Sequence, residues 1–142
     1  MSGAWRTALC LVAAALVASA CANPVASCEQ LSAAQGRWSY RATRESAGQG
    51  TITGSLQIES PNCVDLRGSM DVVEVLATGE SRRIAGPISG TIIDSGHVRF
   101  EAQFGSGSRE HFARIVGDSL SGAWLEIAGS NPGSGPFSGR RE

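Results

Sequence analysis

The chain contains no lysine, and only two of its 142 residues are histidine. Its positive charge comes from 12 basic residues, all arginine, against 13 acidic ones, so the formal net charge is −1. Proteins that bind nucleic acid usually carry a basic excess, and this balance therefore excludes nucleic acid as an expected partner. No Cys-x-x-Cys or His-x-x-x-His spacing occurs, so the sequence predicts no metal site and no cofactor.

The chain also lacks an apolar run long enough to span a bilayer. Its longest uncharged apolar stretch, residues 8–20, is too short for a transmembrane helix. This stretch follows Arg6, in the layout of a secretory signal. We therefore expect residues 1–20 to be a signal peptide.

The signal ends in small residues directly before Cys21. This ending resembles the bacterial lipobox, in which the signal is cut before a cysteine that receives the lipid. The resemblance implies an exported lipoprotein, with a palmitate-type anchor on Cys21 that attaches it to a membrane of the cell envelope. The alternative is ordinary cleavage after Ala20 or Ala22, which would give a free periplasmic or secreted protein.

Cysteine counting agrees with an anchor at Cys21. Cys10 leaves with the signal, so Cys28 and Cys63 remain as an even pair in an oxidising compartment. We predict a disulfide between them, which closes a loop of about 36 residues and contributes roughly 3–4 kcal/mol. A second small-residue stretch ends at Cys28, but Pro24 already interrupts the apolar run before it.

Two patterns follow the signal. Residues 21–35 are predicted to be a tether and a short helix, which Ser27 caps and Gly36 ends. From residue 36 to 142, apolar and polar residues alternate with a period of two, as in strands. The predicted strands are 37–43, 51–59, 63–77, 82–94, 97–104, 109–116, 119–127 and 136–141. Short turns join them, so we predict an all-β domain, an antiparallel up-and-down meander of about eight strands closed into a small barrel.

A spacing of glycines recurs in four of these strands. A large apolar residue stands two positions before Gly54, Gly90, Gly122 and Gly139. Positions two apart share one face of a strand, so these glycines are predicted to face inward. They would let the strands coil sharply, or leave space for a ligand inside the barrel.

The chain resembles the calycin superfamily, which includes lipocalins and avidins, in the Gly36-Arg37-Trp38 motif on the first strand. A short helix precedes that motif, and Arg140 or Arg141 on the last strand could supply the cation that packs on Trp38. The resemblance implies a barrel that holds a small apolar ligand. The candidate lining residues are Trp38, Tyr40, Phe100, Phe104, Phe112 and Trp124.

The stretch Gly117-Asp118-Ser119-Leu120 resembles the nucleophile motif of GDSL esterases, and Asp94 to His97 spells their D-x-x-H. In that family the serine lies early in an α/β domain, whereas only 23 residues follow Ser119 here and none of the predicted elements after it is a helix. Nucleophilic serines need a turn that donates backbone N–H groups to the oxyanion. We predict that Gly117-Asp118 turns a hairpin, with His97 pairing near Val116, and that there is no catalytic residue.

We therefore expect a non-enzymatic lipoprotein of the cell envelope that holds a small apolar ligand. A second interpretation is a protein-interaction or inhibitor lipoprotein that contacts an envelope protein through the barrel's rim loops. An esterase that uses Ser119 is the third. The acids Asp71, Glu74, Glu101 and Glu110 are predicted to be solvated on the outer face.

Overall fold

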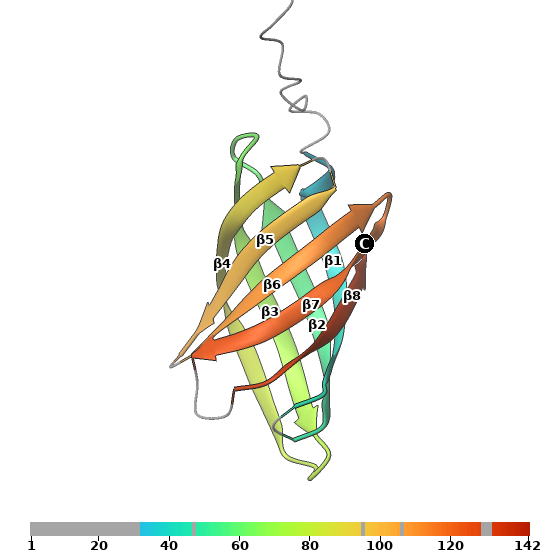
Figure 1. Ribbon diagram of the computed structural model, residues 1–142, viewed down its shortest axis with the longest axis vertical. Helices are drawn as coiled ribbons and strands as arrows, with labels where there is room; N and C mark the ends of the chain where they lie inside the picture. The colour runs from blue at the N-terminus through green and yellow to red at the C-terminus, as the bar shows by residue number, and fades with distance from the viewer. Residues whose placement is uncertain (1–31, 47, 95, 106, 129–131) are drawn as a thin grey trace, which may run out of the picture.

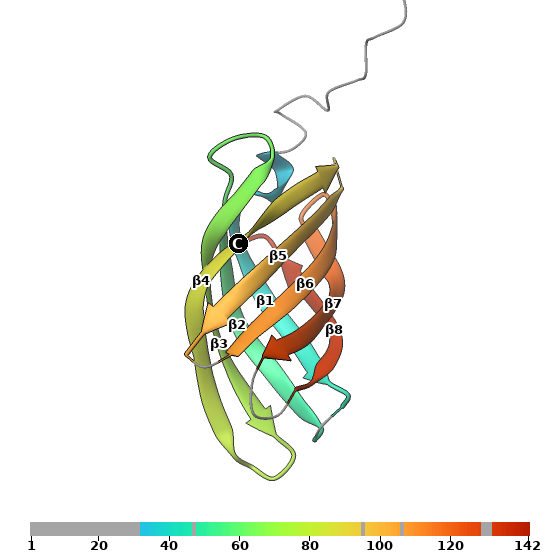
Figure 2. The same ribbon diagram turned by 60° about the vertical axis from the view of Figure 1, so that its left-hand side comes forward.

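The computed structural model describes residues 32–46, 48–94, 96–105, 107–128 and 132–142, and they form one closed barrel (Figures 1 and 2). Each strand pairs antiparallel with the next along the chain, and the eighth pairs with the first. The strands are β1 (Gly36–Arg44), β2 (Gly50–Glu59), β3 (Asp65–Leu76), β4 (Ser81–Asp94), β5 (His97–Phe104), β6 (Gly107–Val116), β7 (Ser119–Ala128) and β8 (Ser134–Arg140). The predicted eight-stranded meander is confirmed.

The barrel has two different ends. One carries a single 3₁₀ turn, η1 (Ser32–Ala34), and the chain's C-terminus (Figure 1). We call it the η1 end. The β1–β2, β3–β4, β5–β6 and β7–β8 connections form the other end, which we call the Arg44 end because β1 finishes there. The helix predicted before Gly36 is a 3₁₀ turn where the structure describes it, and no helix in the described residues is long and apolar enough to cross a membrane.

Alternation along the strands puts one apolar face inside the barrel. On β1, Trp38, Tyr40 and Ala42 are buried, and on β7, Leu120 and Trp124 are buried. Every other residue of a strand points to the same face, so the period of two predicted these positions. The inward side chains form a single continuous core.

The four patterned glycines lie where a neighbouring strand comes very close. A Cβ at Gly122 would lie 1.8 Å from the carbonyl oxygen of Phe112. At Gly54, Gly90 and Gly139 the corresponding distances to a carbonyl oxygen of the adjacent strand are 2.2, 2.1 and 2.3 Å. Neighbouring backbone fills the place of each missing side chain. These glycines therefore permit tight coiling, and the interpretation that they leave space for a ligand is wrong.

The β5–β6 hairpin differs from the prediction by two residues. Phe104 pairs with Gly107, so the turn is tight, and Gly105 adopts a φ of +47° in it. His97 consequently pairs with Arg114 rather than with Val116. Phe112 faces solvent with 46% of its surface exposed, because its neighbours His111 and Ala113 take the inward positions. The prediction that Phe112 lines the barrel is therefore wrong.

Arg141 closes the η1 end, as the calycin resemblance implies. Its guanidinium carbon lies 4.4 Å from the centre of the Trp38 ring, and the group donates to the carbonyl oxygens of Ala33 and Gln35. It also pairs with Asp118 at 3.1 Å. The Trp38 indole N–H donates to Ala34 at 2.9 Å. Arg141 thus joins η1, β1 and the β6–β7 turn.

We expect the substitution Arg141→Gln to lower the free energy of unfolding by about 2–3 kcal/mol, because it removes a cation–π contact and leaves two carbonyl groups without their donor. Arg140→Gln removes the same charge from the neighbouring residue and should change stability by less than about 0.5 kcal/mol. Urea denaturation followed by tryptophan fluorescence measures both. Equal losses in the two variants would contradict this role for Arg141.

Candidate functional site

Five charged side chains gather inside the barrel at the Arg44 end. They come from five different strands, β1, β3, β4, β6 and β7. We call them the buried charge cluster: Arg44, Glu74, Arg82, Arg109 and Glu126. Four of the five side chains are at most 1% exposed, and Arg82 is 38% exposed. Three positive and two negative charges leave the cluster with a formal excess of one positive charge, next to an apolar core.

The two carboxylates organise the cluster. Glu74 accepts from Arg44 at 2.7 Å, from Arg82 at 2.6 Å and from Arg109 at 2.9 Å. Glu126 accepts from the same three arginines at 3.0, 3.3 and 3.2 Å, all through Oε2. Burial alone would raise the pKa of Glu74, but the hydrogen bonds from Arg44 and Arg82 and the charge of Arg109 lower it to about 2.

Two atoms of the buried charge cluster have no hydrogen-bond partner in the described structure. They are Nη1 of Arg109, which is a donor, and Oε1 of Glu126, which is an acceptor. A buried polar atom without a partner costs about 1–3 kcal/mol, and more when the group is charged. The needs of the two atoms are complementary, because Arg109 Nη1 requires an acceptor and Glu126 Oε1 requires a donor.

Aromatic rings separate this cluster from the η1 end. The guanidinium of Arg109 lies 4.4 Å from the Trp124 ring centre, and that of Arg44 lies 5.2 Å from it. Farther along the barrel, the Tyr40 hydroxyl donates to Nε2 of His111 at 3.1 Å, because Nδ1 of the same ring must donate to the Arg109 carbonyl at 3.2 Å. Burial is the main cause that lowers the pKa of His111 to about 3 and raises that of Tyr40.

The remaining predicted lining residues do face inward. Trp38, Tyr40, Phe100 and Trp124 are each at most 1% exposed, and Phe104 is partly buried against the core. They pack on one another and on their neighbours, as in the stack of Phe100 on His111 with ring centres 4.5 Å apart. They therefore contribute to the packed interior, and their role in binding a ligand stays a prediction.

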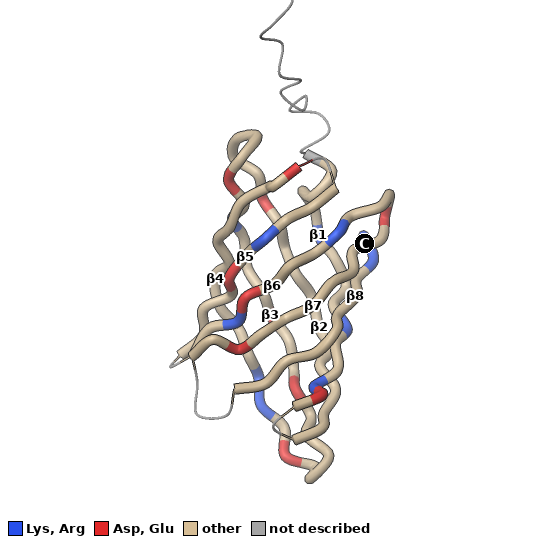
Figure 3. The backbone as a smooth tube through the Cα atoms, in the orientation of Figure 1, with Lys and Arg blue, Asp and Glu red and all other residues tan. Residues whose placement is uncertain are grey.

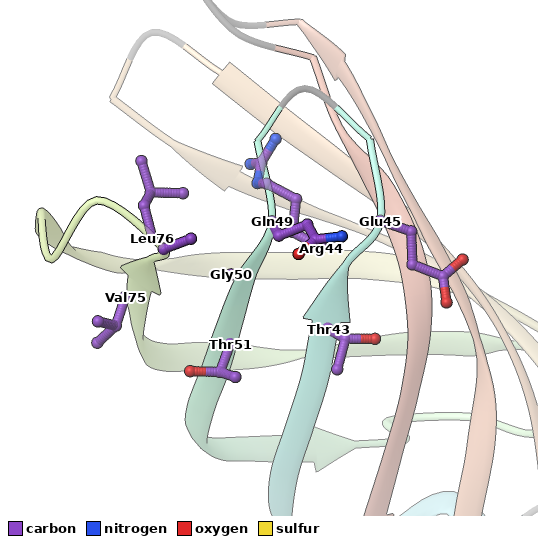
Figure 4. Close-up of a pocket in the computed structure, with 9 residues that line it drawn as sticks. Thr43, Arg44, Glu45, Gln49, Gly50, Thr51, Val75 and Leu76 are labelled. Atoms are coloured by element: carbon purple, nitrogen blue, oxygen red, sulfur yellow. The ribbon is translucent and has the colours of Figure 1, made fainter.

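A pocket of about 590 Å³ lies at the rim of the Arg44 end (Figure 4). It opens over the ends of β1, β2 and β3 and contains both polar groups and the apolar side chains of Val75 and Leu76. Arg44 belongs to this pocket and to the buried charge cluster. The rim pocket and the cluster are therefore neighbours.

The esterase-like residues do not come together. Asp94 and His97 do pair, at 2.8 Å. Ser119, however, lies on β7, and β6 separates that strand from β5, where His97 is placed. Two strand spacings and two residue steps put the two Cα atoms about 12 Å apart. His97 and Ser119 are therefore not on neighbouring strands.

The structure describes one of the three predicted cysteine positions. Cys63 is partly buried against the core, whereas Cys21 and Cys28 lie outside the described residues, so the anchor and the disulfide stay predictions. Within the described ranges, no group of three histidine, cysteine or acidic residues could hold a metal ion.

The sequence prediction missed four members of the buried charge cluster, Arg44, Arg82, Arg109 and Glu126. It also missed the buried His111, and it misplaced Glu74, which is 0% exposed rather than solvated. The signal was present in the alternation. Arg44 stands two positions after the buried Ala42, and Glu126 two positions after the buried Trp124. Following the period of two without regard to side-chain polarity would have found them.

No family model matches the chain, and no curated protein matches it. Solved structures with the same fold do exist. The structure of EF1p2_mFAP2b bound to DFHBI aligns with a TM-score of 0.64 at 10% identity, covering 81% of this chain and 98% of that one. The redesigned β-barrel mFAP1 bound to DFHBI gives 0.58 at 13%, covering 82% and 99%.

A natural protein also shares the fold. The S-type phycobiliprotein lyase CPES from Guillardia theta aligns with a TM-score of 0.53 at 9% identity, covering 80% of this chain and 91% of that one. At these identities the similarities show the fold alone, an eight-stranded antiparallel up-and-down barrel.

We expect acid to destabilise the protein in two steps. The unfolded chain protonates His111 near pH 6.5, whereas the folded chain resists protonation until about pH 3. The stability that neutral His111 contributes is therefore complete above pH 6.5 and is lost as the pH falls from 6.5 towards 3, by up to about 5 kcal/mol. Glu74 adds a loss that begins below pH 4.5, because its pKa is lowered on folding.

Urea denaturation between pH 7.5 and pH 5 isolates the first step. His111→Phe should remove the pH dependence in this range, although it lowers stability at every pH by leaving the Tyr40 hydroxyl without its acceptor. His97→Gln, which changes an exposed histidine, should retain the dependence. A wild-type chain whose stability is flat between pH 6.5 and pH 5 would refute the assignment.

Proposed function

We propose that this chain is an exported, lipid-anchored, non-enzymatic binding protein that holds a small ligand at the Arg44 end of its barrel. The observation that carries the proposal is the pair of unpartnered atoms in the buried charge cluster, Nη1 of Arg109 and Oε1 of Glu126. Two barrels of the same fold are bound to the small molecule DFHBI, which supports binding as the use of the fold.

Stability does not explain the buried charge cluster. Desolvation of buried ions often cancels their mutual attraction, and well-packed apolar residues in their place are often neutral or stabilising. Five charged side chains from five strands occupy interior positions of the barrel that apolar side chains could fill. A binding role accounts for their convergence and for the two unused hydrogen-bonding positions.

The chemistry of the two atoms defines the ligand's polar group. Arg109 Nη1 requires an acceptor, and Glu126 Oε1 requires a donor. A primary amide supplies both in one planar group, whereas a carboxylate supplies acceptors alone. Arg82 is the member of the cluster that reaches solvent, so the ligand enters beside it with its apolar part towards the rim pocket.

Benzamide and benzoate test this site as a matched pair. Benzamide at about 20 mM should raise the Tm by roughly 2–5 °C, and benzoate should have a smaller effect because its carboxylate would face Glu126. Trp124 fluorescence reports the same binding, since Arg109 packs on that ring.

The substitution Glu126→Gln replaces the acceptor with an amide whose N–H groups face the donor of the ligand, so the benzamide effect should disappear. Glu101→Gln makes the same change on β5 outside the cluster and should leave it intact. Equal stabilisation by both compounds, or by neither, would refute the site.

Lipidation at Cys21 is tested separately. The wild-type chain expressed in a bacterial host should fractionate with membranes, and its mass should include a lipid on the mature N-terminus. Cys21→Ala should lose both the lipid mass and the membrane fraction. If neither the mass nor the fractionation changes, the anchor is absent and the protein is a free exported one.

A further inference from the structure

The outer face of the barrel over β7, β8, β1 and β2 is hollowed. Two adjoining hollows of about 480 and 400 Å³ lie there, and both are lined by Arg41 and Ser138. Arg140 lines the larger hollow, and Thr53 and Pro136 line the smaller. We call the two together the outer groove. It lies outside the barrel wall, apart from the buried charge cluster.

The outer groove carries positive charge without a carboxylate. No acidic residue lines either hollow, and among the described residues neither Arg41 nor Arg140 forms an ion pair. Of the six other outer-surface arginines that the structure describes, four are paired and two, Arg67 and Arg114, are not. Those pairs are Arg37 with Glu142, Arg83 with Asp71, Arg99 with Glu110 and Arg141 with Asp118. Figure 3 shows the acidic and basic positions close together along β5 and β6.

Strand pairing places a further arginine, Arg114, in line with the outer groove. Arg41 lies opposite Ser138, Ser138 opposite Ser121, and Ser121 opposite Arg114 on β6. Arg114 is exposed and also has no ion pair in the described structure. Three strand spacings separate Arg41 from Arg114, which is about 14 Å. A single small anion cannot contact both ends, so the complementary partner is an extended one.

The residues between the arginines indicate the chemistry of that partner. Ser121, Ser138 and Thr53 are exposed and present hydroxyl groups that both donate and accept. An acidic peptide would gain most of its affinity by adding a strand to a free sheet edge. The barrel is closed, so β1 to β8 offer no such edge. A hydroxyl-rich chain that carries regular negative charges matches the hydroxyls and the arginines together.

We propose that the outer groove binds an acidic polysaccharide chain, with Arg41, Arg114 and Arg140 on its anionic groups and the serine and threonine hydroxyls on its sugar hydroxyls. This function is independent of the ligand proposed for the Arg44 end, because no residue of the buried charge cluster lines the groove.

Titration of the full chain with polygalacturonate, followed by calorimetry, tests the proposal. Polygalacturonate should bind and neutral dextran of the same length should not. Affinity should fall steeply between 50 and 200 mM NaCl, since the attraction is between exposed charges. The double variant Arg41→Gln with Arg140→Gln should weaken binding by about tenfold or more.

Arg67→Gln is the matched control, since Arg67 is an exposed strand arginine on β3 outside both hollows. It should bind like the wild type, and Arg41→Gln alone should bind more weakly than Arg67→Gln. The proposal is overturned if these two single variants lose affinity equally, if dextran binds as well, or if polyglutamate or phosphatidylglycerol vesicles bind more tightly than polygalacturonate.

Discussion

Closure of eight strands into one narrow ring is the constraint on which the other features depend. Once β8 pairs with β1, the inward side chains have only each other to pack against, and the strands must coil tightly to keep the ring shut. The coiling is possible because glycines such as Gly122 let a neighbouring carbonyl occupy the place of a Cβ. The same closure seals the η1 end, where Arg141 lies on Trp38.

The interior is therefore divided by chemistry along its axis. Rings from Trp38 to Trp124 fill the middle, and the charges of Arg44, Arg109 and their two glutamates occupy the far end. Low exposure makes each of those charges dependent on its partners, because an unpaired buried ion is far more costly than an unpaired surface one. Charges on the outer wall do not depend on partners in this way, since its arginines either pair with a carboxylate or are solvated.

The strands and their inward apolar residues were predictable because a period of two is a local property. Trp38, Tyr40, Leu120 and Trp124 were placed correctly for that reason. Phe112 was not, because the inward positions of β6 belong to the polar Arg109 and His111, and the alternation therefore turns the apolar Phe112 outward. Glu74 was expected in water because isolated carboxylates avoid burial, and its three arginine partners lie on other strands.

By itself, the sequence determined the number of strands, their order and most of the residues that face the core, since local alternation and turn residues encode all of these. Only the tertiary structure decided which residues meet across the barrel. Arg44 and Glu126 lie 82 positions apart in the chain, and Arg141 and Ala33 lie 108 apart. Such meetings depend on the strand registers summed around a closed ring, which no single hairpin encodes.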